Sequence, residues 1–217
     1  MIRSLLLVFN PRQIGECVDS IERLPIDQAW LTGYTEPELE DVISNIVETT
    51  DYTHYIAASD DGVIPEFALD AVVGFLDDHP VVTGYSNLDA TDMRVNLTRS
   101  PFQNVLESTM EDYDLYHLAD VLGWPDDLVP TCFAGFALTG MSRDMWLEYP
   151  YQSRGVPSDY NLCRRLQADG VPIVAPKQAF MWHVKDRMNE VGVGRKRLLI
   201  GSIPAEVRWL TGVAASG

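Results

Sequence analysis

The sequence predicts an α/β fold in which a mainly parallel central sheet is flanked by helices. Three observations lead to this prediction. Strand-like apolar runs alternate with amphipathic, helix-like segments through residues 4–85. The connections between them are short, which in β-α-β units favours right-handed crossovers and parallel strands. At 217 residues, with 46% hydrophobic and 22% charged residues, the composition is that of one ordinary globular domain.

The N-terminal part of the chain is expected to alternate regularly between strand and helix. Each expected strand is a short run rich in apolar, β-branched or aromatic residues, and each expected helix carries apolar residues three or four positions apart. We predict strands at residues 4–9, 28–31, 53–58 and 81–85, and helices at residues 14–24, 36–48 and 65–78.

The rest of the chain is less regular. Residues 89–130 are polar and acidic, and we expect a lid or an acceptor-facing insertion there, with one helix near residues 101–110. Residues 131–140 are small, apolar and glycine-bearing, which would let the backbone approach a ligand closely; a β-bulge in a buried strand would have the same composition. Beyond them we predict helices at residues 141–147 and 159–169, and strands at residues 172–175 and 179–182 that end on His183.

The formal net charge of −16 is unevenly distributed. Between Lys177 and Arg208, seven basic residues face only three acidic ones, so a basic C-terminal end follows an acidic body. An acidic body disfavours nucleic acid and anionic membrane as partners, whereas a local basic patch can hold a phosphate. The three cysteines are widely spaced and predict no disulfide framework. Because no apolar run approaches the length of a membrane span, we expect a cytoplasmic protein.

Two adjacent carboxylates follow the third predicted strand. Asp60 and Asp61 come directly after residues 53–58 and Ser59, and Gly62 breaks the strand pattern beyond them. In open α/β sheets, ligand crevices form where strands end, and a hard divalent cation takes oxygen ligands. The same residue types also make ordinary turns, so a solvated turn is the alternative.

Two strings in the second half resemble a known family. Residues 158–166, SDYNLCRRL, and residues 180–183, FMWH, resemble the inverting "family two" glycosyltransferases of the GT-A fold, which read Glu-Asp-x-Asp-Leu-Cys-x-Arg-Leu and then Trp-His. Ser59-Asp60-Asp61 resembles the family's Asp-x-Asp motif with its first aspartate replaced. Phe9-Asn10 resembles the aromatic–asparagine pair that closes its first strand. The resemblance covers about residues 4–183 and implies a Rossmann-like GT-A fold.

The resemblance implies a metal site. Asp61 would be a direct ligand of a divalent cation, and His183 would be a second protein ligand from the far side. Asp60 would support Asp61 or contact the ribose or the sugar. Manganese suits a mixed shell of carboxylate, imidazole and phosphate better than magnesium, which rarely takes nitrogen. The alternative for His183 is the commoner role of a lone histidine, a core or rim residue.

The resemblance also implies a catalytic base. Asp159 matches the family's base, which removes a proton from the acceptor hydroxyl. A place in the first turn of a helix favours its ionised form. Without the resemblance, Asp159 could equally be a residue that only complements the helix dipole. Ser158 departs from the family, which has a glutamate there, often near the acceptor.

The resemblance places Phe9 and Asn10 near the nucleotide. The charge of the C-terminal basic residues makes them candidates to clamp its diphosphate: Lys185, Arg187, Arg195, Lys196 and Arg197. For the last three of these, a solvated basic tail is the alternative. Residues 32–35 read TGYT instead of the Asp-rich segment that contacts the base in the family, so the base is not assigned.

The single domain of residues 1–217 is expected to have three parts. Residues 1–88 would bind the nucleotide, residues 89–183 would hold the acceptor and the catalytic residue, and residues 184–217 would form a flexible basic segment. The polar, glycine-containing run at residues 184–197 has too little apolar surface to order itself. We expect donor and metal to fold it over the diphosphate.

The sequence therefore predicts a metal-dependent inverting glycosyltransferase. It would move a sugar from a nucleotide diphosphate sugar to a hydroxyl acceptor such as a glycan or a glycoprotein. One alternative is the same chemistry on hydroxylated bases in DNA, which the net charge disfavours. Others are a nucleotidyltransferase that makes sugar nucleotides, and an inactive module that binds them.

Overall fold

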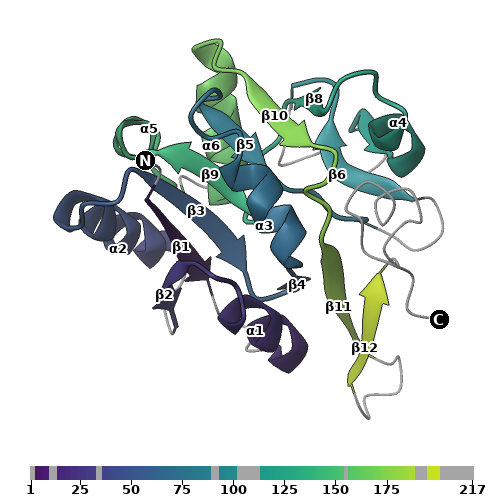
Figure 1. Cartoon of the computed structure of the whole chain (residues 1–217), viewed down its shortest axis with the longest axis horizontal. Helices are drawn as coiled ribbons and strands as arrows, with labels where there is room; N and C mark the ends of the chain where they lie inside the picture. The colour runs from purple at the N-terminus through teal and green to yellow at the C-terminus, as the bar shows by residue number, and fades with distance from the viewer. Residues whose placement is uncertain are drawn as a thin grey trace.

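The chain folds around a seven-stranded mixed sheet flanked by helices (Figure 1). The computed structural model describes residues 3–9, 14–32, 36–88, 93–101, 113–153, 156–188 and 195–200, with the backbone alone at 36–37, 185–188 and 195–200. The strands are β1 (Ser4–Phe9), β2 (Asp27–Leu31), β3 (His54–Ser59), β4 (Gly62–Val63), β5 (Val81–Thr83), β6 (Arg94–Thr98), β7 (Leu115–His117), β8 (Leu128–Thr131), β9 (Thr139–Ser142), β10 (Ile173–Pro176), β11 (Trp182–Met188) and β12 (Arg195–Ile200). The helices are α1 (Gly15–Glu22), α2 (Glu36–Thr49), α3 (Glu66–Val73), α4 (Leu118–Leu122), α5 (Arg143–Glu148) and α6 (Ser158–Ala168).

The order of the strands in the main sheet is β2-β1-β3-β9-β5-β10-β8. β2, β1, β3, β5 and β10 run in one direction, and β9 and β8 run against them. The predicted α/β class and the mainly parallel sheet are therefore confirmed. The sheet also contains an insertion that the alternating pattern did not predict, because β9 lies between β3 and β5 and pairs antiparallel with both.

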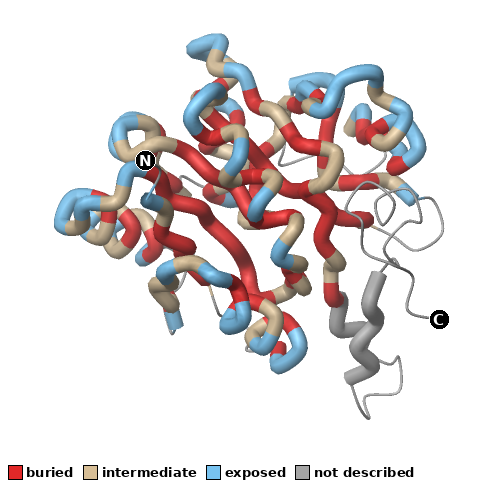
Figure 2. The backbone as a smooth tube through the Cα atoms, viewed as in Figure 1, coloured by how far each residue is buried: buried red, intermediate tan, exposed pale blue. Residues whose placement is uncertain are grey.

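Alternating residues of the central strands bury the two faces of the sheet against different helices. One face, with Leu7 and Tyr55, packs against apolar residues of α2, α5 and α6. The other face, with Leu6 and Ile56, packs against α1 and α3. Figure 2 shows the central strands as long buried stretches between partly exposed helices. This three-layer arrangement leaves the ends of the strands as the place where a ligand can enter.

Most elements of residues 4–85 lie where the sequence places them, whereas the second half differs more. β4, β6, β7, α4 and β8 were not predicted, and the helix expected near residues 101–110 lies largely outside the described residues. The last predicted strand, residues 179–182, is wrong in its position. Phe180 makes only an isolated bridge with Tyr85, and the strand proper begins at Trp182, so His183 lies inside β11 and not after a strand. The pairing with β4, a short strand from the other half of the chain, produces this shift.

The beginning of the C-terminal segment forms a hairpin. β11 pairs antiparallel with β12 from His183 with Ile200 to Met188 with Arg195, and β4 pairs along the other edge of β11. The predicted flexibility of residues 184–217 is not tested by this pairing, and residues 189–194 and 201–217 lie outside the description. None of the helices in the described residues has both the length and the apolarity needed to cross a bilayer.

His54, at the start of β3, makes stability depend on pH. Its side chain is buried, and this burial lowers the pKa of the imidazole, although Asp77 and the Leu76 backbone act in the opposite direction. The unfolded chain therefore takes up a proton at a higher pH than the folded protein does. Stability is present above the usual histidine pKa of about 6.5 and is lost as pH falls through and below that value.

We predict that the melting temperature of the wild type falls relative to that of His54→Gln as pH is lowered from about 7.5 to about 5.5. Comparing the two proteins at each pH removes the effect of the acidic body, which is common to both. Parallel pH profiles would show that His54 does not contribute to the pH dependence.

Candidate active site

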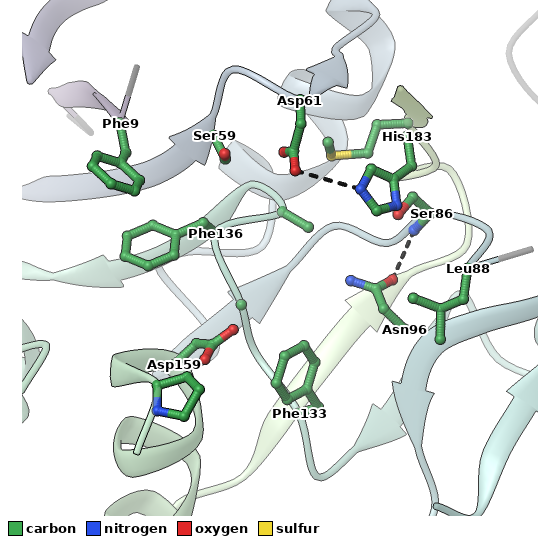
Figure 3. A pocket seen from close by; sticks show the side chains of 14 residues that line it. Phe9, Ser59, Asp61, Ser86, Leu88, Asn96, Phe133, Phe136, Asp159 and His183 are labelled. Atoms are coloured by element: carbon green, nitrogen blue, oxygen red, sulfur yellow. Dashed lines mark hydrogen bonds and ion pairs between the residues drawn. The ribbon is translucent and has the colours of Figure 1, made fainter. Parts of the chain in front are cut away.

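A pocket of about 330 Å³ opens at the carboxyl ends of β1 and β3 (Figure 3). The chain passes from β1 to β2 on one side and returns to β3 on the other, so this is the point at which the strand order reverses. Such points are where open α/β sheets bind ligands. The pocket is lined by Phe9, Ser59, Asp61, Ser86, Leu88, Asn96, Phe133, Gly135, Phe136, Ala137, Pro157, Asp159, Met181 and His183.

Asp60 and Asp61 follow β3 but face different surroundings. The Asp60 backbone N–H donates to the Phe9 carbonyl at 3.0 Å, which ties the ends of β1 and β3 together. The Asp60 residue is fully buried and is not among the residues that line the pocket. Asp61 lines it, with 22% of its side chain exposed. The predicted roles of Asp60, support of Asp61 or contact with the ribose or the sugar, stay predictions.

His183 reaches the pocket because β11 pairs with β4. His183 is paired with Gly62, and the Val184 N–H donates to the Asp61 carbonyl at 2.7 Å. A Cβ at Gly62 would meet the terminal methyl group of Met181, which would then have to move aside. The result is that His183 Nε2 lies 3.4 Å from Asp61 Oδ2, and each side chain is 22% exposed.

The Asp61–His183 pair matches part of the coordination shell of a divalent cation. Metal–ligand bonds of roughly 2.1 Å place neighbouring ligand atoms about 3 Å apart, close to the separation seen here. Among the described residues, no group of three or more His, Cys, Asp and Glu side chains could hold a metal ion. The pair therefore fits a cation that takes its remaining ligands from a bound substrate and water.

One feature of His183 departs from the usual pattern of histidine ligands. Its second ring nitrogen, Nδ1, is buried and makes no hydrogen bond with any described residue. A histidine bound to a metal usually donates from that nitrogen to a carboxylate or carbonyl. The carboxylate of Asp61 is thus the stronger candidate ligand of the two.

Asp159 enters the pocket from the first turn of α6. The helix is held in the core by Leu162, Cys163 and Leu166, so the position of its first turn is set by packing. Asp159 Oδ1 accepts a hydrogen bond from the Tyr160 backbone N–H at 2.8 Å. This contact and the helix dipole both favour a negative charge at this place.

The segment from Phe133 to Ala137 lies against Asp159. Cys163 Sγ accepts from the Ala134 N–H at 3.1 Å and donates to the Ala134 carbonyl at 3.3 Å. Burial raises the pKa of the Cys163 thiol, which therefore stays protonated and able to donate. A Cβ at Gly135 would lie 3.3 Å from Asp159 Oδ2. Residues 133 and 135–137 of this glycine-bearing stretch line the pocket, and the strand β9 begins only at Thr139. The close approach of its backbone to a ligand stays a prediction.

Aromatic rings form the wall on the β1 side. The rings of Phe9 and Phe136 have centroids 5.6 Å apart, and Phe136 stacks on Tyr151 at 4.4 Å. Burial, followed by the charge of Asp159, raises the pKa of the Tyr151 phenol, so the stack remains neutral. Asn10, predicted beside Phe9, lies outside the described residues.

The side chains of the two basic residues predicted to contact the diphosphate are not part of the described structure. Lys185 and Arg187 belong to β11 by their backbone, two and four residues beyond His183, and their side chains lie outside the description. Their predicted contact with the diphosphate stays a prediction. In the described lining of the pocket there is no lysine or arginine.

Several lining residues were not predicted from the sequence. Ser86 and Leu88 come from the segment after β5, and Asn96 comes from β6, where the sequence has no regular apolar pattern. Asn96, Leu97 and Thr98 have the spacing of a glycosylation sequon, and no local pattern indicates that the asparagine faces a ligand pocket.

Figure 3 shows Asp159 across the pocket from Asp61 and His183, with Phe133 and Asn96 along the intervening wall. Four of the residues with predicted roles, Phe9, Asp61, Asp159 and His183, therefore line one pocket. Their roles stay predictions. Chemically, the arrangement places a proton acceptor on one side of a bound molecule and a potential cation site on the other.

Comparison with known proteins bears on the fold alone. No protein-family model matches the chain, and no curated protein matches it. Among solved structures, the crystal structure of A197 from STIV is similar, with a TM-score of 0.59 at 16% sequence identity. The match covers 93% of this chain and 95% of A197, so the two proteins share their fold over nearly their whole lengths.

Proposed function

We propose that this chain is a metal-dependent inverting glycosyltransferase of the GT-A type. It would transfer a sugar from a nucleotide diphosphate sugar to a hydroxyl acceptor. The observation that carries the proposal is the placement of Asp159 opposite the Asp61–His183 pair in one pocket. Inversion requires that the nucleophile arrive on the face of the sugar opposite the leaving group, and this pocket offers a group suited to each side.

Asp159 would act on the acceptor. A hydroxyl is a poor nucleophile until a base removes its proton in the transition state. Asp159 Oδ1 accepts a hydrogen bond from the Tyr160 N–H, and Oδ2 lies close to Gly135, where both residues line the pocket. Proton transfer to Asp159 would accompany attack of the acceptor oxygen on the anomeric carbon, and the bond from that carbon to the diphosphate would break on the opposite side.

Asp61 and His183 would hold the diphosphate end. When bound there, manganese would act as a Lewis acid that neutralises the charge growing on the leaving group. Phe9 and Phe136 would pack against the nucleoside, because their rings form the apolar wall at the end of β1. Asn10 would add a contact to the nucleotide, as the family resemblance implies, and Lys185 and Arg187 would add contacts to its diphosphate through their charge.

A screen of nucleotide sugars, each with and without manganese, tests the proposal. Thermal stabilisation that needs both sugar nucleotide and metal, followed by release of nucleoside diphosphate when an acceptor is added, is the expected result. Release of pyrophosphate from a nucleoside triphosphate would indicate a nucleotidyltransferase instead. Binding without turnover on any acceptor would indicate an inactive module, and salt-sensitive binding to duplex DNA would favour a DNA acceptor.

We predict that Asp61→Asn abolishes manganese-dependent donor binding and nearly all turnover, because an amide is a much weaker ligand for a divalent cation than a carboxylate. Calorimetric titration of the donor, with and without manganese, measures the effect. The matched control is Asp78→Asn, the same change at an exposed residue that lies beyond α3 and is not in the lining of the pocket. Donor binding by Asp61→Asn with unchanged metal dependence would show that Asp61 is not a ligand.

Asp159→Asn is expected to lower the transfer rate by roughly 10²- to 10⁴-fold, the range for loss of a general base. Donor and metal affinity should stay within about twofold, since the amide keeps the size of the carboxylate. Asp144→Asn is the control, because Asp144 is an exposed aspartate at the second residue of α5, as Asp159 is of α6. An equal loss of donor affinity in Asp159→Asn would make this residue a donor contact and not the base.

A further inference from the structure

Asn96 presents a fixed pair of hydrogen-bond donors to the pocket. It lies in the middle of β6, between Val95 and Leu97, which are both fully buried in the cluster around Tyr85 and Phe180. Because side chains alternate across a strand, Asn96 points the other way, and there it lines the pocket. The neighbouring core residues therefore decide where its side chain goes.

Two hydrogen bonds with the backbone of Ser86 set the orientation of the amide. The Asn96 N–H donates to the Ser86 carbonyl at 3.1 Å, and the Ser86 N–H donates to Asn96 Oδ1 at 2.8 Å. A backbone N–H can only donate, so the atom that faces it must be the amide oxygen and not the nitrogen. Nδ2 consequently lies on the other side of the amide, and Figure 3 shows it directed into the pocket.

Nothing in the described part of the chain uses these donors. Asn96 Nδ2 makes no hydrogen bond with any described residue, whereas Oδ1 accepts from the Ser86 N–H. Ser86 is 4% exposed, so the anchor is shielded from water. The two N–H groups are thus oriented in advance toward a ligand, which lowers the entropy cost of binding one.

The surroundings of Nδ2 indicate what kind of ligand it would bind. Leu88 and Phe133 supply apolar surface to the same pocket as Asn96, and all three are drawn in Figure 3. The two N–H donors of the amide suit an oxygen acceptor. Because the amide is neutral, a neutral oxygen such as a hydroxyl is a suitable partner. An apolar ring face next to an amide donor is complementary to a sugar ring, which has C–H groups on its faces and hydroxyl oxygens at its edge.

We propose that Asn96 and Phe133 form the sugar subsite of this pocket, with Nδ2 donating to a ring hydroxyl and the Phe133 ring against the sugar's C–H face. The inference deepens the proposed glycosyltransferase function and rests on it. The sugar is either the one being transferred or one belonging to the acceptor, since both would lie between Asp61 and Asp159.

Asn96→Asp separates the ligand contact from the structural one. The aspartate keeps the oxygen that accepts from Ser86 N–H, and it replaces the two donors with an oxygen that can only accept. Asn45→Asp, at an exposed position of α2, makes the same change of charge away from the pocket. Phe133→Leu tests the other half of the subsite without touching the anchor, and it also serves if Asn96→Asp does not fold, as judged from its melting temperature.

The measurement is calorimetric titration, in manganese, of UDP-glucose, GDP-mannose, UDP and GDP into the wild type and the three variants. If the subsite holds the transferred sugar, Asn96→Asp and Phe133→Leu weaken the nucleotide sugar by about 10- to 100-fold, because a donor is lost or an apolar face is reduced. Their affinity for the matching nucleoside diphosphate stays within about twofold of the wild-type value. The affinity of Asn45→Asp stays within the same range for both the nucleotide sugar and the nucleoside diphosphate. If the subsite holds the acceptor sugar, donor affinity is unchanged and the KM for saccharide acceptors rises instead.

Either result supports the subsite and says which sugar occupies it. If the wild type binds a nucleotide sugar and the two pocket variants match it in both donor affinity and acceptor KM, the subsite is overturned while the proposed function stands. If the wild type binds none of these nucleotides and no other nucleotide sugar in the screen, the proposed function fails and the subsite with it.

Discussion

The pairing of β4 with β11 is the contact on which the candidate site depends. β4 directly follows the turn that carries Asp61, whereas β11 comes from the far end of the described chain. The hydrogen bond from the Val184 N–H to the Asp61 carbonyl joins the two, and the absence of a side chain at Gly62 lets the Met181 methyl group fit beside the turn. Backbone pairing fixes the register residue by residue, so it can place a carboxylate and an imidazole 3.4 Å apart.

A second and separate contact holds the other side of the pocket. Cys163 and Asp159 lie four residues apart on α6, and the two hydrogen bonds between Cys163 and Ala134 join this helix to the loop that contains Gly135. Because the thiol is buried and neutral, it can both donate and accept. The two sides of the pocket are therefore supported by different elements. A substrate could contact both sides without disturbing either the β4–β11 pairing or the hydrogen bonds between Cys163 and Ala134.

The elements of the fold were predicted from local periodicity, whereas the site residues were predicted from a family resemblance. The sequence predicts β1 at the residues where it lies, and the other predicted strands and helices of residues 4–85 overlap the observed ones, because their periodicity is local. The short strand β4 was not predicted, and α3 ends earlier than expected. Asp61, Asp159 and His183 were selected by resemblance to a family and meet in one pocket, although they are far apart in the chain. Asp60 was selected with them and is buried outside the lining, because successive residues of a turn face different directions.

By itself, the sequence determined the α/β class, the N-terminal elements and the residue types available for chemistry, because runs of apolar residues and their spacing act over a few neighbours. Only the tertiary structure decided that β9 lies between β3 and β5, that His183 belongs to a strand, and that Asn96 faces the pocket. Each of these depends on hydrogen bonds between segments distant in sequence. Local periodicity carries no information about which distant backbone groups will pair.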